Sequence, residues 1–178
     1  MFKLETDRLI LRDMSLEDEC VFVAMSQDVK YQRFYDESDC GPNKYRELTQ
    51  LFVEQASEVP RQSYQLAVEN KDSGKFIGTV CLRLEGDKQA SMGCALSREN
   101  QGKGLSIEAS EALADFGFSE LGIHRIYAET ISKNLAAIKL CKSLGMKQEA
   151  CFKDHRFFKG KWWDTVRLAV VRSDWKKA

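Results

Sequence analysis

The sequence predicts an α+β fold built on a mixed β-sheet of about seven strands, and three features of the chain carry this prediction. In the middle of the chain, apolar residues alternate with polar ones over three consecutive segments joined by short turns, as in an antiparallel meander. Two segments with apolar residues at helical spacing then stand on either side of one further strand. The chain closes on two strand-like segments joined at Lys159-Gly160-Lys161, as in a hairpin.

The first third of the chain is predicted to hold one strand and two helices. Leu9–Met14 has the pattern of a short strand, and Ser15 follows it as a helix N-cap. Asp18 stands at the position that reciprocates this cap, so a helix is expected from there to about Gln27. A second helix is expected over 43–57. Four of its apolar residues are predicted to share one face: Tyr45, Leu48, Leu51 and Phe52.

Three strands are expected next. Tyr64, Leu66 and Val68 alternate with polar residues, and the turn at 71–75 contains a glycine. Two further strands follow on either side of a turn at 85–88: Phe76–Leu84 and Gln89–Leu96. Because consecutive strands joined by short turns usually pair, these three are expected to form the antiparallel meander.

The second half of the chain alternates helices with strands. A helix is expected over Leu105–Phe118, a strand over Arg125–Ile131, and a helix over Asn134–Leu144 that ends at Gly145. Five apolar residues of the first of these helices are predicted to lie on one side: Leu105, Ala109, Ala112, Leu113 and Phe116. The closing hairpin is expected to pair Glu149–Phe158 with Trp162–Val171.

The composition excludes several classes of protein. Lys and Arg number 27, as do Asp and Glu, whereas proteins that bind nucleic-acid phosphates usually carry a basic excess. The six cysteines form no CxxC pair and only two histidines are present, so no metal site is expected. The N-terminus lacks a signal-peptide pattern, and no apolar run is long enough to span a membrane. We expect one cytoplasmic domain over residues 1–178, without nucleic-acid or membrane partners.

The segment from Gln101 to Ser106 carries the strongest indication of chemistry. It contains Gly102 and Gly104 and joins a predicted strand to a predicted helix. Glycines let the backbone approach a ligand closely, and the first N–H groups of a helix attract an anion. The unit is therefore a suitable cradle for a diphosphate. It is neither a Walker motif nor GxGxxG, because Ile107 stands where the third glycine would be.

The same segment, Gln101-Gly102-Lys103-Gly104-Leu105-Ser106, closely resembles the Q/R-x-x-G-x-G/A signature of the GNAT acetyltransferase superfamily. Further segments resemble the RimJ/RimL-type branch in order and spacing: Glu5–Arg12, Phe76–Val80, Met92–Leu96, Asn134–Ala137 and Leu144–Met146. The resemblance covers nearly the whole chain. It implies a mostly antiparallel sheet with helices on both faces, in which two central parallel strands splay apart, here those ending near Ser97 and beginning near Arg125.

The resemblance implies that acetyl-CoA binds in this gap. Its pantetheine is expected to pair with backbone groups around Leu96 and Ser97. Its diphosphate is expected on the N–H groups of Gln101, Gly102, Lys103, Gly104, Leu105 and Ser106, with added charge from Lys103. Asn134 is expected to contact the cofactor from the next helix. Ala137 stands where RimL-type enzymes use a serine.

The implied reaction is direct attack of a primary amine on the acetyl thioester. A base must remove an amine proton, and an acid can protonate the departing thiolate. Many GNAT enzymes place a tyrosine seven residues after the helix asparagine. This chain has Cys141 there, which is a candidate acid or a buried thiol that fills the core. Asp154 is the candidate base, and strand alternation is expected to turn its rival His155 to the opposite face. Glu85 and Glu129 are further alternatives.

The closing hairpin departs from the RimL-type pattern. Arg156 stands where those enzymes carry an acidic residue, which argues against a ribosomal-protein substrate, and Asp164 is expected to have a structural role. Four aromatic residues are expected either to wall the amine site or to pack in the core: Phe157, Phe158, Trp162 and Trp163.

The acceptor stays open at this stage, between a protein N-terminus, a lysine, a polyamine, an amino acid and an antibiotic. A non-catalytic acyl-CoA-binding module fits the same loop, because such a module needs the cradle but no acid or base. A nucleotide-binding domain is a third alternative, which the absent Walker pattern disfavours. A homodimer is possible, since relatives often dimerise.

Overall fold

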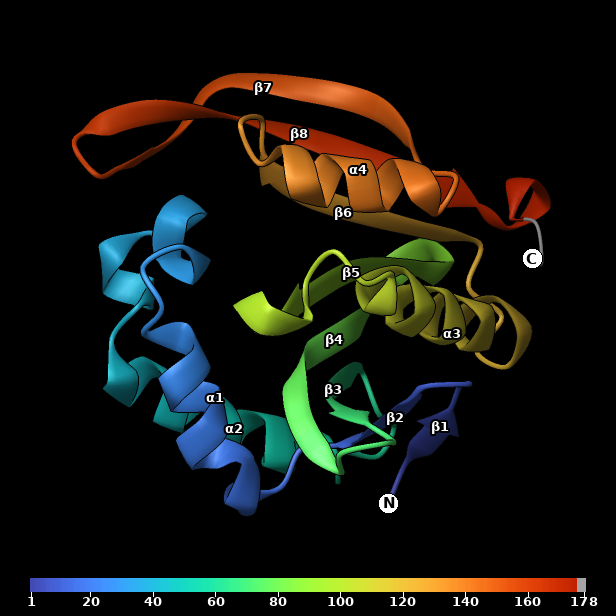
Figure 1. Cartoon of the computed structure of the whole chain (residues 1–178). Helices are drawn as coiled ribbons and strands as arrows, with labels where there is room; N and C mark the ends of the chain where they lie inside the picture. The colour runs from blue at the N-terminus through green and yellow to red at the C-terminus, as the bar shows by residue number, and fades with distance from the viewer. Residues whose placement is uncertain (176–178) are drawn as a thin grey trace.

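A computed structural model describes residues 1–175 of the protein (Figure 1). Within this range eight strands form one sheet, in the order β1-β2-β3-β4-β5-β6-β8-β7. The strands are β1 (Lys3–Glu5), β2 (Leu9–Asp13), β3 (Ser63–Asn70), β4 (Lys75–Glu85), β5 (Gln89–Leu96), β6 (Arg125–Ile131), β7 (Lys147–Phe158) and β8 (Lys161–Val171). The α-helices are α1 (Glu19–Ser26), α2 (Pro42–Gln55), α3 (Leu105–Ser119) and α4 (Leu135–Ser143).

Neighbouring strands of this sheet run antiparallel, except for the parallel pair of β5 and β6. The predicted mixed α+β fold and its central meander, β3-β4-β5, are therefore confirmed. The predicted number of strands was one too low, because β1 pairs with β2 at the edge of the sheet. The three residues of β1 are too few to show an alternating pattern in the sequence.

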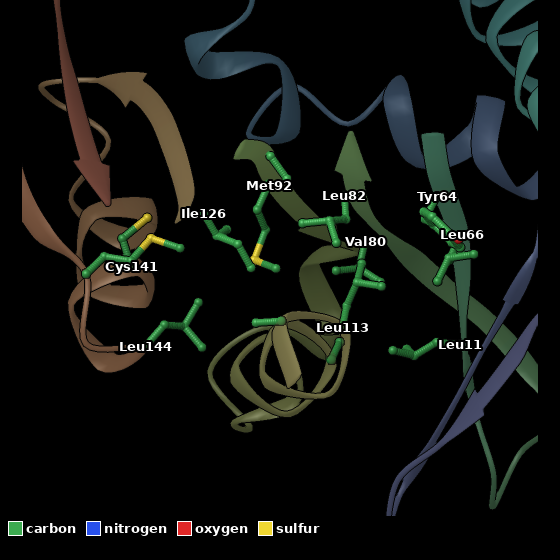
Figure 2. Close-up of a cluster of buried hydrophobic side chains, with 14 of the residues drawn as sticks. Leu11, Tyr64, Leu66, Val80, Leu82, Met92, Leu113, Ile126, Cys141 and Leu144 are labelled. Carbon is green, nitrogen blue, oxygen red and sulfur yellow. The ribbon is translucent and has the colours of Figure 1, made fainter. Parts of the chain in front are cut away.

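Different helices cover the two faces of the sheet, as expected. On β3, Leu66 packs in the core beneath α3 and α4, whereas its neighbour Ala67 packs beneath α1 and α2. Figure 2 shows the first of these cores, in which Leu113 of α3 and Cys141 of α4 lie near strand residues such as Ile126. No helix within residues 1–175 is long and apolar enough to cross a membrane.

The face predicted for α2 is wrong at one position. Tyr45 and Phe52 are buried, but Leu51 is 43% exposed. Leu51 follows Tyr45 by six residues, which places it on another side of a helix with about 3.6 residues per turn. Thr49, four residues after Tyr45, is buried instead, and its hydroxyl donates to the Tyr45 carbonyl at 2.9 Å.

The parallel pair of β5 and β6 opens partway along its length. The strands are in register only from Gln89 and Arg125 to Ser91 and Tyr127. Both continue beyond that point, β5 to Leu96 and β6 to Ile131, without pairing with each other. The splay implied by the resemblance is therefore present, and Figure 1 shows the two strands diverging.

Asp18 ties β2 to the first turn of the N-terminal helical segment. Its carboxylate accepts the Ser15 backbone N–H at 2.8 Å, which is the reciprocal bond predicted for the cap. Two terminal nitrogens of Arg12 also donate to it, each at 2.8 Å. Burial alone would raise the pKa of Asp18, but the bonds from Arg12 and Ser15 outweigh it and hold the pKa below its ordinary value.

We expect Asp18→Asn to lower the free energy of unfolding at pH 7 by about 1.5–3 kcal/mol, the usual scale for lost hydrogen bonds to a charged group. Because the folded pKa of Asp18 lies below the unfolded one, its contribution is present above pH ~3.9 and is lost as the pH falls further. Urea unfolding from neutral to acid pH measures the difference. Glu17→Gln, at an exposed position in the same turn, is the control. A difference that persists unchanged in acid would contradict the assignment.

Candidate functional site

The gap between β5 and β6 leaves backbone groups in the middle of the sheet without strand partners. The Ser97 N–H points toward β4, where it donates to the Ile77 carbonyl at 2.8 Å. Backbone groups alternate in direction along a strand, so those of Leu96 and Cys94 point into the gap. Because β6 has already separated from β5 at this level, the gap presents a strand edge with which an extended ligand can pair.

Of the two residues predicted to pair with pantetheine, the structure brings Leu96 to the gap and turns Ser97 away. The Ser97 carbonyl accepts the Asn100 N–H at 2.9 Å, and its hydroxyl accepts the Asn100 side-chain amide at 2.8 Å. The Leu96 carbonyl accepts the Gln101 side-chain amide at 2.9 Å. The Leu96 N–H and the backbone of Cys94 are therefore the groups that face the gap.

The loop before α3 presents a row of backbone N–H groups. Gly102 and Gly104 have φ values of 74° and 77°, which favour glycine. The first bond of the helix runs from the Glu108 N–H to the Gly104 carbonyl. In the described part of the chain, no acceptor is bonded to the N–H groups from Gly102 to Ile107. Free N–H groups, the helix dipole and the exposed Lys103 together are features that favour an anion at this loop.

The start of α3 is anchored against β5. Leu105 is buried in the core, and Ser106 is half-buried. Burial raises the pKa of Cys94 to about 12, a rise that the nearby hydroxyls of Ser110 and Ser106 reduce. The cradle is therefore fixed to the same strand whose backbone faces the gap.

Asn134 lies at the start of α4, beside the end of β6. Its N–H donates to the Ile131 carbonyl at 2.8 Å, and its side-chain oxygen accepts the Ala137 N–H at 3.3 Å. The two residues of this helix that were predicted to meet the cofactor thus lie together in its first turn.

Cys141 lies deeper, in the hydrophobic core beneath the sheet (Figure 2). It is 6% exposed and belongs to the same cluster as Leu144 and Met146. Burial raises its pKa to about 11, so the thiol stays protonated at neutral pH. A buried thiol that keeps its proton is compatible with both alternatives for Cys141, core packing and proton donation.

A bulge in β7 changes the expected directions of Asp154 and His155. Phe152 pairs with Thr165, and Arg156 with Trp163, so three residues of β7 lie opposite one of β8. Asp154 sits in this bulge with a φ of 46° and is exposed. The regular alternation from which opposite faces were expected for Asp154 and His155 is therefore interrupted here. The His155 ring instead contacts the Thr165 hydroxyl through Nδ1.

The other candidate bases already have partners. Glu85 accepts the Tyr127 hydroxyl at 2.8 Å, and Glu129 accepts Arg167 at 2.7 Å. These side chains stand on the face of the sheet opposite α3 and α4. Their neighbours along β6 and β4, Ile126, Ala128 and Leu84, pack in the α3 core, and side chains alternate in direction along a strand. This uncovered part of the sheet is polar and charged.

The aromatic residues of the β7–β8 hairpin divide into two pairs. Phe158 is buried and stacks on Trp163 at 5.1 Å, and Phe34 meets Trp163 edge-on. Phe157 and Trp162 contact each other and are each 58% exposed. Phe158 therefore packs in the interior, whereas Phe157 and Trp162 are exposed at the surface of the hairpin. The structural role expected for Asp164 is present, because its carboxylate accepts the Asp154 N–H and its carbonyl accepts the Ser132 N–H.

The segment between α1 and α2 reaches across to this hairpin. Lys159 donates from its ammonium group to the carbonyls of Gln32 and Arg33, at 2.6 and 3.2 Å. A cleft of about 500 Å³ opens beside this segment, between α1 and the residues that follow β5. Met25, Tyr31 and Glu99 are among its lining residues. The α1 face therefore offers an approach to the end of β5 from the side opposite α3.

Two residues that contact the loop or its helix, Arg8 and Thr6, were not expected from the sequence. Arg8 donates to the Lys103 carbonyl at 3.0 Å and to Glu108 at 2.6 Å, and Thr6 donates to Glu108 at 2.6 Å. Their segment was noted only as part of a family resemblance. An acidic residue in the first turn of a helix is a common pattern, and nothing in the sequence shows that its partners lie about 100 residues earlier.

The chain matches the model of a known family over most of its length. Residues 8–147 match the family described as the acetyltransferase (GNAT) domain. The uncharacterized N-acetyltransferase p20 of Bacillus licheniformis is 28% identical over 180 residues, which cover 98% of this chain and 99% of that protein.

Two solved structures share the fold. The ribosomal-protein-S5-alanine acetyltransferase of Vibrio fischeri superposes with a TM-score of 0.82 at 22% identity, over 99% of this chain and 100% of that one. The spermidine N-acetyltransferase of Vibrio cholerae, in complex with CoA and spermine, gives a TM-score of 0.80 at 22% identity, over 95% and 98%.

The loop geometry predicts the effect of a side chain at Gly104. We expect Gly104→Val to weaken CoA binding at least about tenfold, because a branched side chain disfavours the left-handed backbone and would crowd the anion. Calorimetric titration measures the dissociation constant. Gly122→Val is the matched control, since Gly122 has a similar φ of 65° in open space, away from the loop. If the two folded variants bind CoA with equal affinity, the diphosphate does not bind at this loop.

Proposed function

The chain belongs to the GNAT acetyltransferase family, and we propose that it transfers the acetyl group of acetyl-CoA to a primary amine. The observation that carries this proposal is the gap between β5 and β6, which adjoins the N–H row from Gly102 to Ile107. We further propose that residues 1–178 act as one domain of the RimJ/RimL-type branch, in the cytoplasm.

The cofactor fits the gap by chemistry. Pantetheine carries amide groups that can pair with a strand edge, and the Leu96 N–H and the backbone of Cys94 supply that edge. A diphosphate needs several N–H donors at a helix start, and the loop supplies them. Gly102 to Ser106 and Asn134 are accordingly the proposed cofactor contacts, with Ala137 beside Asn134. The Gln101 N–H is already bonded to the Arg98 carbonyl, so Gln101 contributes by ordering the loop. Ser97 then orders the loop through Asn100 and does not bind the cofactor by its N–H.

The reaction needs a neutral amine and a stabilised oxyanion. The amine attacks the thioester carbon, the carbonyl oxygen gains negative charge, and the tetrahedral centre collapses as the CoA thiolate leaves. Backbone N–H groups directed into the gap at Cys94 and Leu96 are suitable donors to that oxygen. The nitrogen loses a proton, which a base must accept.

Asp154 is the proposed base. Within residues 1–175, its carboxylate receives no hydrogen bond or ion pair, whereas those of Glu85 and Glu129 are engaged by Tyr127 and Arg167. An unpaired carboxylate is free to accept a proton from an incoming ammonium group. The exposed bulge that holds it lies on the hairpin that Lys159 joins to the α1 side.

The decisive experiment is release of CoA thiol from acetyl-CoA in the presence of amines of different classes. We expect turnover with at least one primary amine and none with the matching tertiary amine, which has no proton to lose. Acetyl-CoA should also raise the melting temperature by mass action. Stabilisation without turnover across the panel would favour a non-catalytic acyl-CoA-binding module, and stabilisation by ATP alone a nucleotide-binding domain.

Cys141 is the proposed proton donor to the departing thiolate. Its raised pKa keeps the proton in place at neutral pH, and it follows Asn134 by two helical turns. We expect Cys141→Ala to lower kcat by roughly 10²–10⁴-fold with little change in KM, the usual scale for a lost general acid.

Cys141→Ser is the control, because a hydroxyl can still relay a proton, and circular dichroism verifies the fold of both variants. A drop in kcat of less than about threefold, far below the range for a general acid, would assign Cys141 to core packing. The thiolate would then leave unprotonated or take its proton from water.

A further inference from the structure

The turn between β1 and β2 is bonded to the first turn of α3 through one carboxylate. Glu108 accepts the Thr6 hydroxyl at 2.6 Å and the Arg8 backbone N–H at 2.9 Å on one oxygen. On the other oxygen it accepts the Arg8 guanidinium at 2.6 Å. The Glu108 side chain is only 18% exposed, whereas that of Arg8 is 48% exposed. We call these three residues the loop brace.

The loop brace extends from the helix to the loop itself. A third nitrogen of Arg8 donates to the Lys103 carbonyl at 3.0 Å. The guanidinium also lies 3.4 Å from the position that a Cβ on Gly104 would take. Arg8 therefore bridges Glu108, in the helix, and Lys103, between the two left-handed glycines. Arg8 thereby holds the peptide group of Lys103, which lies within the row of free N–H groups from Gly102 to Ile107.

The turn between β1 and β2 is itself bonded to the sheet. Lys71 donates from its ammonium group to the Thr6 carbonyl at 2.5 Å, and its backbone N–H donates to the Arg8 carbonyl at 2.9 Å. The brace is thus rigid on the side of β2 and β3. Burial alone would raise the pKa of Glu108, but the bonds from Thr6 and Arg8 lower it, so the carboxylate is charged at neutral pH.

We infer that Arg8 and Glu108 are positioning residues, which hold the loop from Gly102 to Ile107 in the conformation that receives the cofactor diphosphate. This inference rests on the proposed function. Two glycines in a short loop give the unbound chain many conformations, and ordering them on binding would cost affinity. The brace supplies that order beforehand. All three guanidinium nitrogens of Arg8 are bonded to Glu108 or to the Lys103 carbonyl. Arg8 therefore acts by holding the loop and does not contact the diphosphate itself.

The test compares two acetyl donors. Acetyl-CoA carries the diphosphate, whereas S-acetylpantetheine carries the same thioester and lacks it. We expect Arg8→Ala to raise KM for acetyl-CoA about tenfold, the effect of losing one charge-assisted bond, and to leave kcat/KM for S-acetylpantetheine and KM for the amine unchanged.

Arg8→Lys separates positioning from charge. A lysine keeps the positive charge but cannot bridge Glu108 and the Lys103 carbonyl with a planar fork. We expect it to behave like Arg8→Ala, and Glu108→Gln to fall between them and the wild type. Full recovery by Arg8→Lys would overturn the positioning role in favour of simple attraction of the anion.

Controls separate this inference from the fold and from the proposed function. Arg12→Ala removes the two ion pairs of Arg12, to Asp18 and Glu69, which lie away from the loop. It should lower stability without changing the ratio of kcat/KM for acetyl-CoA to kcat/KM for S-acetylpantetheine. Equal losses with both donors in the Arg8 variants would overturn positioning and indicate general unfolding. If Arg8→Ala does not fold, Thr6→Val removes a single hydroxyl bond and answers the same question. A wild type that binds no acetyl-CoA would overturn the proposed function itself, and the positioning role with it.

Discussion

The separation of β5 from β6 is the constraint on which the rest of the structure depends. Backbone N–H and C=O groups inside a sheet are normally paired, and leaving them unpaired costs free energy. Here the pairing ends at Ser91 and Tyr127, although both strands continue. On their other edges both strands stay paired, β5 with β4 and β6 with β8. The core beneath, with Met92, Leu113 and Ile126, holds both against α3.

The elements around the gap follow from this constraint. On one face, α3 and α4 start beside it, so the loop of Gly102 and Gly104 and the cap at Asn134 lie at its mouth. On the other face, α1 and α2 cover only part of the sheet, and the segment between them reaches the hairpin through Lys159 (Figure 1). A ligand paired with β5 would therefore lie between a cofactor side rich in free N–H groups and an acceptor side rich in charged side chains.

The sequence was sufficient for the elements that have strong periodicity, and for the loop. The meander, both long helices of the second half and the left-handed glycines follow from local pattern and turn chemistry. The predictions that failed concern features that are non-local or irregular. β1 is too short to show an alternating pattern. Leu51 lies six residues after Tyr45, a spacing that does not keep both on one face of a helix. The bulge at Asp154 breaks the alternation from which side-chain directions were inferred. The contact of Arg8 with Glu108 depends on tertiary folding alone.

Amide hydrogen exchange tests most directly whether the gap between β5 and β6 is the cofactor site. The amides of Cys94 and Leu96, and those from Gly102 to Ile107, should exchange rapidly in the free protein and become protected when acetyl-CoA is added. Ala90, in the part of β5 that pairs with β6, should be protected in both states. Protection that appears elsewhere while these amides stay unchanged would contradict the claim.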